Sequence, residues 1–269
     1  GLGNAGQRHA RNALELGHDV VAYEPRAMDF HGICRVASVE QLCALRPEAV
    51  IIATPPDQHF ADAVNCVDQG LDVFVEKPLA ATLEQATACH ALAAERRTRL
   101  AVSYQMRCLP TLRAFRDRMT PWIVPEGITG TVVNVDCLSA WPTATYRRDF
   151  LLEYSHELDV VSWLLGDGLE VMTYLNSPAC WIMFVRTATL FTHLAVILSG
   201  IGERPRRGIE WWDMDHNGLW TFDQAENETA YKTEVEWFLK GEPLSDGLGA
   251  LRLVEAARRS AVSGKWEAA

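Results

Sequence analysis

Residues 1–6 read Gly1-Leu2-Gly3-Asn4-Ala5-Gly6, which is the glycine pattern of a dinucleotide-binding turn. Glycine suits such a turn because it adopts positive φ and lets backbone N–H groups approach a pyrophosphate at the positive end of a helix. The helix is expected over residues 7–16, and an apolar strand is expected over residues 19–23. The strand that normally precedes the turn is absent, so we expect the complete chain to begin upstream of Gly1.

Glu24 closes the strand at 19–23, where a carboxylate binds the ribose of a dinucleotide. It would accept hydrogen bonds from both ribose hydroxyls and repel a 2′-phosphate, which predicts NAD as the cofactor. Arg26, two residues on, carries a guanidinium that can bind a phosphate. NADP therefore stays open as the alternative.

Helices alternate with short apolar strands from residue 1 to about residue 105. The predicted strands are 19–23, 49–53, 72–75 and 100–104, and the predicted helices are 7–16, 39–45, 60–69 and 83–96. This alternation is typical of a parallel, doubly wound sheet with helices on both faces. We predict an α/β dinucleotide-binding domain of the Rossmann type over residues 1–108.

The pattern changes after Pro110. Helices are predicted at 111–119, 156–165, 230–240 and 248–263, a strand at 130–136, and antiparallel strands within 171–220, which is rich in Thr, Val, Ile and Trp. These elements predict an α+β domain over residues 109–269 with an open, mainly antiparallel sheet. We expect it to bind the substrate and form oligomers, with the ligand crevice where the two domains meet.

Composition limits the function classes. The formal net charge of −10 and the lack of a long Lys/Arg block argue against nucleic acid as a partner. The most apolar stretch, residues 181–201, is interrupted by Arg186 and His193 and predicts strands rather than a membrane span. The seven cysteines are scattered without a Cys-x-x-Cys motif, which indicates reduced thiols of a cytoplasmic protein and no metal site.

Four separated segments resemble the glucose-fructose oxidoreductase and inositol dehydrogenase family, Gfo/Idh/MocA. They are the opening Gly-x-Gly-x-x-Gly, Ala53-Thr54-Pro55-Pro56-Asp57-Gln58-His59, Glu76-Lys77-Pro78 and Ser155-His156-Glu157-Leu158-Asp159. Their order and spacing are similar to those of the family over nearly the whole chain, and the Glu-Lys-Pro element is the most specific. The resemblance implies an NAD(P)-dependent oxidoreductase that transfers a hydride between nicotinamide and a secondary alcohol or ketone of a sugar, sugar derivative or cyclitol.

The resemblance also implies catalytic roles. In that family the lysine lies beside the nicotinamide and hydrogen-bonds the substrate hydroxyl, and a histidine on the first helix of the second domain exchanges the hydroxyl proton. These residues correspond to Lys77 and His156. Many members have an aspartate four residues before the histidine, where this chain has Leu152, so Glu153 is the nearest candidate to orient His156 or relay its proton.

The remaining predicted site residues surround these three. The predicted cofactor-binding residues are Gly1, Gly3, Asn4, Ala5, Gly6, Glu24, Arg26, Thr54, Pro55, Pro56, His59, Glu76, Lys77 and Gln105. The predicted substrate-binding residues are Lys77, Arg107, Trp141, Tyr146, Arg147 and His156. We expect His59 mainly to hold the loop and helix that follow the two prolines.

Structural alternatives exist for the catalytic residues. A lysine before proline is often a surface residue at a strand end, a histidine at a helix start can cap it, and a carboxylate in a first turn is stabilised by the helix dipole alone. Trp141, Tyr146 and Arg147 fit a solvated loop equally well. Two functional alternatives stay open, a non-catalytic sensor of dinucleotide and sugar, and a reductase of a non-sugar substrate. The open sheet predicts a homodimer or homotetramer.

Overall fold

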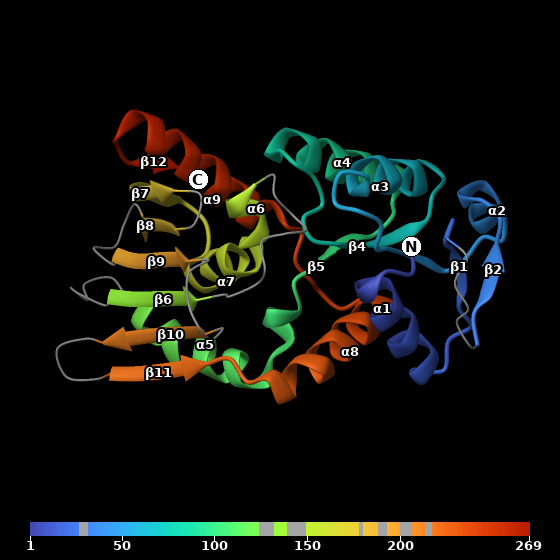
Figure 1. The fold of residues 1–269 in the computed structure, drawn as a ribbon, viewed down its shortest axis with the longest axis horizontal. Helices are drawn as coiled ribbons and strands as arrows, with labels where there is room; N and C mark the ends of the chain where they lie inside the picture. The colour runs from blue at the N-terminus through green and yellow to red at the C-terminus, as the bar shows by residue number, and fades with distance from the viewer. Residues whose placement is uncertain are drawn as a thin grey trace. The chain divides into compact units, whose positions relative to one another are not determined.

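The structure is a computed structural model and describes residues 1–26, 32–123, 132–138, 149–177, 180–187, 193–199, 206–212 and 217–269. The chain forms two compact units (Figure 1). Unit 1 contains Gly1–Cys108 and Asn227–Leu248, and unit 2 contains Leu109–Glu226 and Gly249–Ala269. The chain thus leaves unit 1 after Cys108 and returns to it over Asn227–Leu248. The predicted division into residues 1–108 and 109–269 does not include this return.

Unit 1 alternates helices with parallel strands. In chain order its first elements are α1 (Asn4–Glu15), β1 (Val21–Tyr23), β2 (Cys34–Val36), α2 (Val39–Ala44), β3 (Ala49–Ile52), α3 (His59–Asp68), β4 (Asp72–Glu76), α4 (Leu83–Arg96), β5 (Leu100–Ser103) and the 3₁₀-helix η1 (Gln105–Cys108). β1 pairs with β2, and β4 lies between β3 and β5, all in parallel register. The predicted Rossmann architecture is confirmed. Helix α1 begins earlier than predicted because Gly3 is its N-cap.

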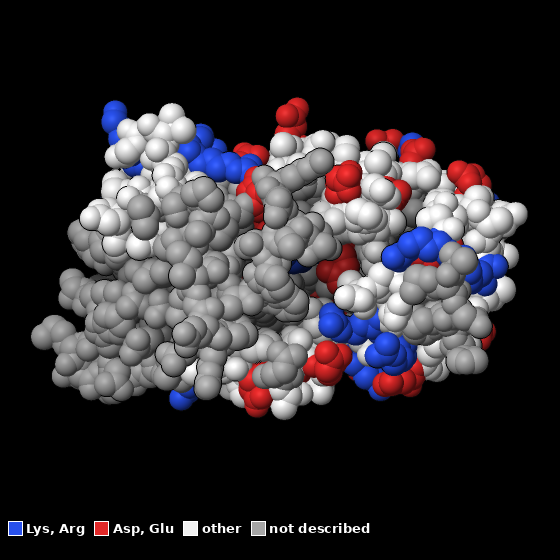
Figure 2. Space-filling view, viewed as in Figure 1, with Lys and Arg blue, Asp and Glu red and all other residues white. Residues whose placement is uncertain are grey.

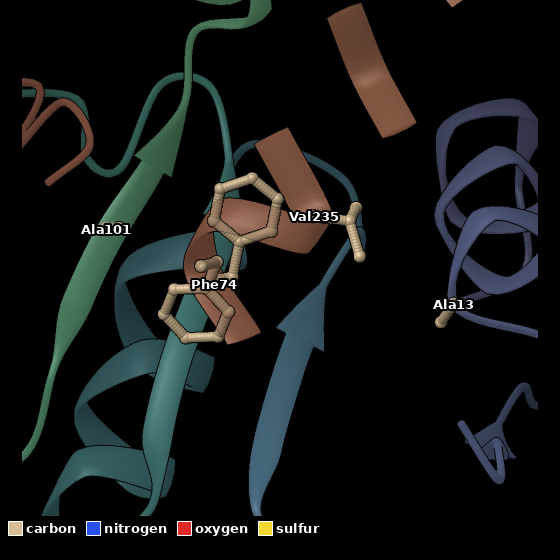
Figure 3. Close-up of a cluster of buried hydrophobic side chains, with 5 residues drawn as sticks. Ala13, Phe74, Ala101 and Val235 are labelled. Carbon is tan, nitrogen blue, oxygen red and sulfur yellow. The ribbon is translucent and has the colours of Figure 1, made fainter. Parts of the chain in front are cut away.

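The core of unit 1 forms around β4. Val73, Phe74 and Val75 are fully buried, as expected of a strand covered on both faces. Phe74 stacks on Phe238 with ring centroids 5.2 Å apart and packs in a cluster with Val235 (Figure 3). Phe238 and Val235 belong to α8 (Gln224–Lys240), so a helix from late in the sequence completes this core.

Unit 2 is built on a seven-stranded sheet with the order β11-β10-β6-β9-β8-β7-β12 (Figure 1). Its elements are α5 (Pro110–Ile123), β6 (Val132–Leu138), α6 (Phe150–Glu153), α7 (Ser155–Leu165), β7 (Leu169–Ser177), β8 (Cys180–Thr187), β9 (His193–Ser199), β10 (Arg206–Trp212), β11 (Asn217–Thr221), α9 (Leu248–Ser263) and β12 (Glu267–Ala268). The mainly antiparallel sheet is confirmed. However, β9 and β10 do not pair as successive strands, because β6 lies between them and pairs in parallel with β9.

Helix α9 holds unit 2 together. The N–H of Thr173 in β7 donates to Ser260 Oγ at 2.8 Å, and Thr173 Oγ1 donates to the carbonyl of Ala257 at 2.8 Å. Helix α7 approaches α9 so closely at Gly249 that a Cβ there would lie 2.0 Å from Ser162 Oγ. This close approach fixes α7, which carries His156.

The surface of unit 1 mixes charges of both signs. On the face shown in Figure 2, its Lys and Arg side chains are interspersed with Asp and Glu. Among the described residues, no helix is both long and apolar enough to cross a membrane.

Candidate active site

The glycine turn packs backbone against backbone. A Cβ on Gly6 would lie 1.9 Å from the carbonyl oxygen of Gly1, so the position requires glycine. A Cβ on Gly3 would meet nothing within 4 Å, which shows open space at the start of α1. No side chain caps this helix and its first turn, beginning at Asn4 and Ala5, holds no acidic residue. The positive end of α1 therefore suits the pyrophosphate of a dinucleotide.

Glu24 lies just after β1 and is bonded to the glycine turn. Its side chain is 3% exposed, and Oε2 accepts the backbone N–H of Leu2 at 2.6 Å. Arg26 donates through Nε to Oε1 at 2.7 Å and through a terminal nitrogen to Oε2 at 3.0 Å. The hydrogen bond from Arg26 lowers the pKa of Glu24 to about 2, against the opposing effect of burial and with help from the Leu2 N–H.

Arg35 reinforces this corner and was not predicted. Its guanidinium donates to the carbonyl of Glu24 at 2.6 Å and to that of Arg26 at 2.8 Å. One guanidinium group therefore bonds the Glu24 carboxylate, and the other bonds the backbone of the same corner. The Glu24 carboxylate, which is predicted to bind the ribose of NAD, is bonded to Arg26 in this structure.

The loop after β3 is held by α3. Thr54 Oγ1 donates to Asp62 Oδ2 at 2.7 Å, and the Gln58 N–H donates to the Pro55 carbonyl at 2.8 Å. His59, which is 1% exposed, brings Nε2 within 2.8 Å of the Thr54 carbonyl. Pro56 is half-buried. The predicted cofactor segment around Thr54 is thus a fixed loop at the carboxyl end of a parallel strand, where open α/β sheets bind ligands.

Glu76 ends β4, and Lys77 follows directly. His9 of α1 lies with Nε2 at 2.7 Å from Glu76 Oε1, and the N–H of Lys77 donates to Glu76 Oε2 at 3.2 Å. Burial raises the pKa of Glu76, but the hydrogen bond and charge of His9 and the charge of Lys77 outweigh it, and the pKa lies below its usual range. On the other side of Lys77, His59 Nδ1 lies 2.8 Å from the Pro78 carbonyl.

Gln105 and Arg107 follow β5 in η1. Gln105 is 2% exposed and donates from Nε2 to Asn227 Oδ1 at 3.2 Å, whereas its Oε1 has no hydrogen-bond partner in the described part of the chain. Glu234 of α8 accepts Ser103 Oγ at 2.8 Å. Arg107 is half-buried. No local pattern in the sequence points to the α8 side chains, because their partners are over 100 positions earlier.

The other catalytic candidates belong to unit 2. His156 is the second residue of α7 and is 8% exposed, and Glu153, the last residue of α6, is half-buried. Asp149 fixes the start of α6, because its Oδ1 accepts the N–H of Leu151 at 3.2 Å. Arg258 of α9 pairs with the other carboxylate oxygen of Asp149. The predicted substrate contacts at Trp141, Tyr146 and Arg147 lie outside the described residues.

Several of the predicted residues in unit 1 contact one another. Direct hydrogen bonds link Glu24 to Arg26 and His59 to Thr54, and Glu76 bonds to the N–H of Lys77. Sequence reasoning missed His9, Arg35 and Glu234. Within the described ranges, no three His, Cys, Asp or Glu side chains gather in a way that would hold a metal ion.

Comparison with known proteins gives a family match and several relatives. Residues 1–104 match the family model GFO_IDH_MocA, described as an oxidoreductase family with an NAD-binding Rossmann fold. The chain is 27% identical over 181 residues to the rhizopine catabolism protein MocA of Rhizobium meliloti, covering 62% of this chain and 56% of that protein. It is 32% identical over 132 residues to inositol 2-dehydrogenase 1 of Saccharopolyspora erythraea, covering 47% of this chain and 37% of that protein. The chain thus matches about half or less of these relatives.

A longer match is to inositol 2-dehydrogenase of Rhizobium meliloti strain 1021, which is 27% identical over 275 residues and covers 84% of this chain and 82% of that protein. Among solved structures, a myo-inositol dehydrogenase from Corynebacterium glutamicum has a TM-score of 0.81 at 19% identity, covering 99% of this chain and 96% of that chain. The WlbA dehydrogenase from Thermus thermophilus, in complex with NAD and UDP-GlcNAcA, has a TM-score of 0.76 at 18% identity, covering 96% and 92%. At these identities the structures establish a shared fold.

Proposed function

We propose that the chain is an NAD-dependent dehydrogenase of the Gfo/Idh/MocA type, because residues 1–104 match the NAD-binding Rossmann fold of that oxidoreductase family. Its substrate would be a secondary alcohol of a cyclitol, sugar or sugar derivative, and the reverse reduction is equally allowed by the chemistry. The observation that carries the proposal is the position of Lys77. It follows the last residue of β4 directly, in the same unit as the glycine turn and at the strand end where such folds bind ligands.

Lys77 would act on the substrate oxygen. Bound NAD supplies the oxidant, and the alcohol must lose its hydroxyl proton as it is oxidised. The ammonium of Lys77 would donate a hydrogen bond to that oxygen and stabilise the negative charge that develops on it. A lysine serves this role because its compact charge acts on a single atom.

His156 would take the hydroxyl proton. Neutral imidazole accepts a proton readily in the physiological range, and His156 lies at the start of α7 on a helix held by α9. Glu153, three residues earlier, would orient the ring or pass the proton on. The support for these two roles is the resemblance of the Ser155–Asp159 segment to the family pattern.

The substrate class is proposed from the relatives. Two of the relatives described above are named inositol 2-dehydrogenases, and the WlbA structure contains UDP-GlcNAcA, a sugar nucleotide. A polyhydroxylated ring is therefore our first candidate. Reduction of a non-sugar substrate is the alternative within the same reaction class.

A ligand panel followed by turnover tests the proposal. Thermal shift with NAD, NADP, myo-inositol and a UDP-sugar ranks the ligands, since a ligand stabilises the protein in proportion to its binding to the folded state. NADH formation is then followed by absorbance. Lys77→Met should lower turnover by about 100-fold or more while the Kd for NAD changes only a few-fold.

The matched control for this variant is Lys240→Met, which removes an exposed lysine paired with Glu236 in α8. It should turn over normally. Near-normal turnover in Lys77→Met would remove the proposed mechanism. Binding of NAD and a polyol without any turnover by the wild type would favour the sensor alternative.

We also propose a homodimer or homotetramer formed through the sheet of unit 2, in a cytoplasmic protein. Met172 and Phe184 are directly opposite each other on β7 and β8, on the face away from the α9 contact made by Thr173. Tyr174, at a bulge in β7, is 79% exposed. Light scattering should give a multiple of the chain mass, and Phe184→Arg should reduce the measured mass.

Free buried thiols such as Cys43 and Cys66 support a reducing compartment.

A further inference from the structure

Two buried histidines contact the Glu76-Lys77-Pro78 turn from different elements. His9, from α1, contacts the Glu76 side chain before Lys77, and His59, from α3, contacts the Pro78 carbonyl after it. Each histidine is 1% exposed. Lys77 is therefore the residue between two anchored neighbours, and both anchors lie in unit 1.

Two aromatic rings pack against the buried ring of His9, which also contacts Glu76. Phe74 and Tyr231 approach its ring edge-to-face at centroid distances of 5.6 and 6.1 Å. Its Nδ1 has no hydrogen-bond partner within the described residues. A polar ring buried in this way is costly unless its one contact is kept, so the ring directs Nε2 at the Glu76 carboxylate.

The Glu76 carboxylate connects the ring of His9 to the backbone of Lys77. One oxygen faces His9, and the other accepts the N–H of Lys77 at 3.2 Å. Rotation of the carboxylate would break one bond or the other. The orientation of α1 is thereby coupled to the peptide group that carries Lys77.

His59 fixes the other side of the turn. Its two ring nitrogens lie 2.8 Å from the carbonyl oxygens of Thr54 and Pro78. Both oxygens are acceptors, so the ring bridges them fully when both nitrogens carry a proton. The loop after β3 is in this way bonded to the turn after β4.

We propose that His9 and His59 are positioning residues for Lys77, and that they set its place relative to the two segments expected to bind the dinucleotide. His9 connects it to the helix of the glycine turn, and His59 connects it to the Thr54 loop. The reason that such positioning matters is that a displacement of about 1 Å at a reacting group can cost roughly 100-fold in rate. The catalytic part of this inference rests on the proposed function.

The test observes Lys77 directly. Lysine labelled with ¹³C at Cε gives one resonance for each of the four lysines in the sequence, which are Lys77, Lys232, Lys240 and Lys265. The loss of one resonance in Lys77→Met assigns the Lys77 signal. The spectra are recorded on the whole chain without substrate, alone and with NAD, for His9→Leu and His59→Leu.

The matched control is His90→Leu. His90 belongs to α4 and also bonds a backbone carbonyl through Nε2, that of Asp246 at 2.8 Å. We expect the Lys77 resonance to shift in the His9 and His59 variants and to stay in place in the control. The other three lysine resonances should stay in all variants.

Kinetics supply the second readout. With a polyol that the wild type oxidises, kcat should fall by about 10- to 100-fold in the His9 and His59 variants, with the Kd for NAD within about threefold. His9→Asn and His59→Gln, which keep a donor, should recover part of kcat. They also replace the leucine variants in the spectra if those fail to fold.

An unchanged Lys77 resonance in folded His9 and His59 variants would overturn the proposal, even if their melting temperatures fell, because the histidines would then serve stability alone. The spectra decide this without any substrate. A wild-type protein that oxidises no polyol would count against the proposed function instead, so the two failures are distinct.

Discussion

The backbone N–H of Leu2 donates to Glu24 Oε2 at 2.6 Å, so the carboxylate after β1 is bonded to the glycine turn that begins α1. The two parts of a dinucleotide that these elements would bind, the ribose and the pyrophosphate, are only a few bonds apart. The hydrogen bond fixes the spacing of their binding groups before a ligand arrives. Pre-organisation of this kind lowers the ordering cost of binding.

Glu24 should make stability depend on pH in the acidic range. Its pKa is lowered from 4.5 to about 2 in the folded chain, first by the hydrogen bond from Arg26. A lowered pKa means that the stabilisation is present above the unfolded value near 4.5 and is lost as the pH falls through that value toward 2. Glu24→Gln should therefore lower the free energy of unfolding at pH 7 by about 1–3 kcal/mol.

Urea unfolding at pH 7, 5 and 3 measures the effect of this substitution. The difference between wild type and Glu24→Gln should shrink between pH 5 and pH 3. Glu48→Gln, at an exposed position, serves as the control and should stay within about 0.5 kcal/mol of the wild type at each pH. A constant difference across the series would show that charge on Glu24 is not the source of its stabilisation.

The choice between NAD and NADP should depend on the same pair. Arg26→Ala removes the guanidinium that bonds the Glu24 carboxylate. The carboxylate can then accept hydrogen bonds from the ribose hydroxyls, so the Kd for NAD should change little or fall. Glu24→Ala should improve binding of NADP relative to NAD, because the group that repels a 2′-phosphate is gone. Calorimetric titration with both dinucleotides measures the ratio. A wild-type preference for NADP that Arg26→Ala abolishes would reverse the assignment.

The elements with a strong local pattern could be predicted, but their long-range pairing could not. Residues 83–96 form a helix with the predicted bounds, since Thr82 caps its start and apolar residues recur along it. The place of β6 between β9 and β10 is set by tertiary packing, because no short stretch of sequence encodes a partner more than 50 residues away. The return of α8 to the β4 core was missed for the same reason.

The candidate site shows the same limit at the level of side chains. The glycine turn and Lys77 belong to sequence motifs that indicate a function, so they could be named as candidates from the sequence. His9 lies on a helix among polar neighbours, and nothing in that local pattern signals that it is buried against Glu76. The role of Arg35 likewise cannot be predicted from its sequence neighbours, because its partners are two backbone carbonyls of another segment.

His156 should control the pH dependence of turnover. As a base for alcohol oxidation it must be neutral, so the rate should rise with pH through one ionisation and then level. His156→Asn should lower the rate by about 100-fold or more and remove that rise. Glu153→Gln should shift or weaken the rise less severely. Initial rates from pH 5 to 9 measure both, and an unchanged profile in His156→Asn would assign the proton transfer to another group, with Lys77 the next candidate.

Two glycines of the turn should respond in opposite ways to the same small change. A Cβ on Gly6 would lie 1.9 Å from the Gly1 carbonyl oxygen, a backbone atom that can move away only if the turn opens. Gly6→Ala should therefore lower the melting temperature and weaken NAD binding together.

A Cβ on Gly3 meets nothing within 4 Å, so Gly3→Ala should keep the stability of the wild type. If the open space at Gly3 receives the pyrophosphate, however, the added methyl group excludes it, and the Kd for NAD should rise by about 10-fold or more with no loss of stability. Differential scanning fluorimetry and NAD titration of both variants separate the two effects. Normal NAD binding by Gly3→Ala would place the pyrophosphate elsewhere and remove the glycine turn from the binding site.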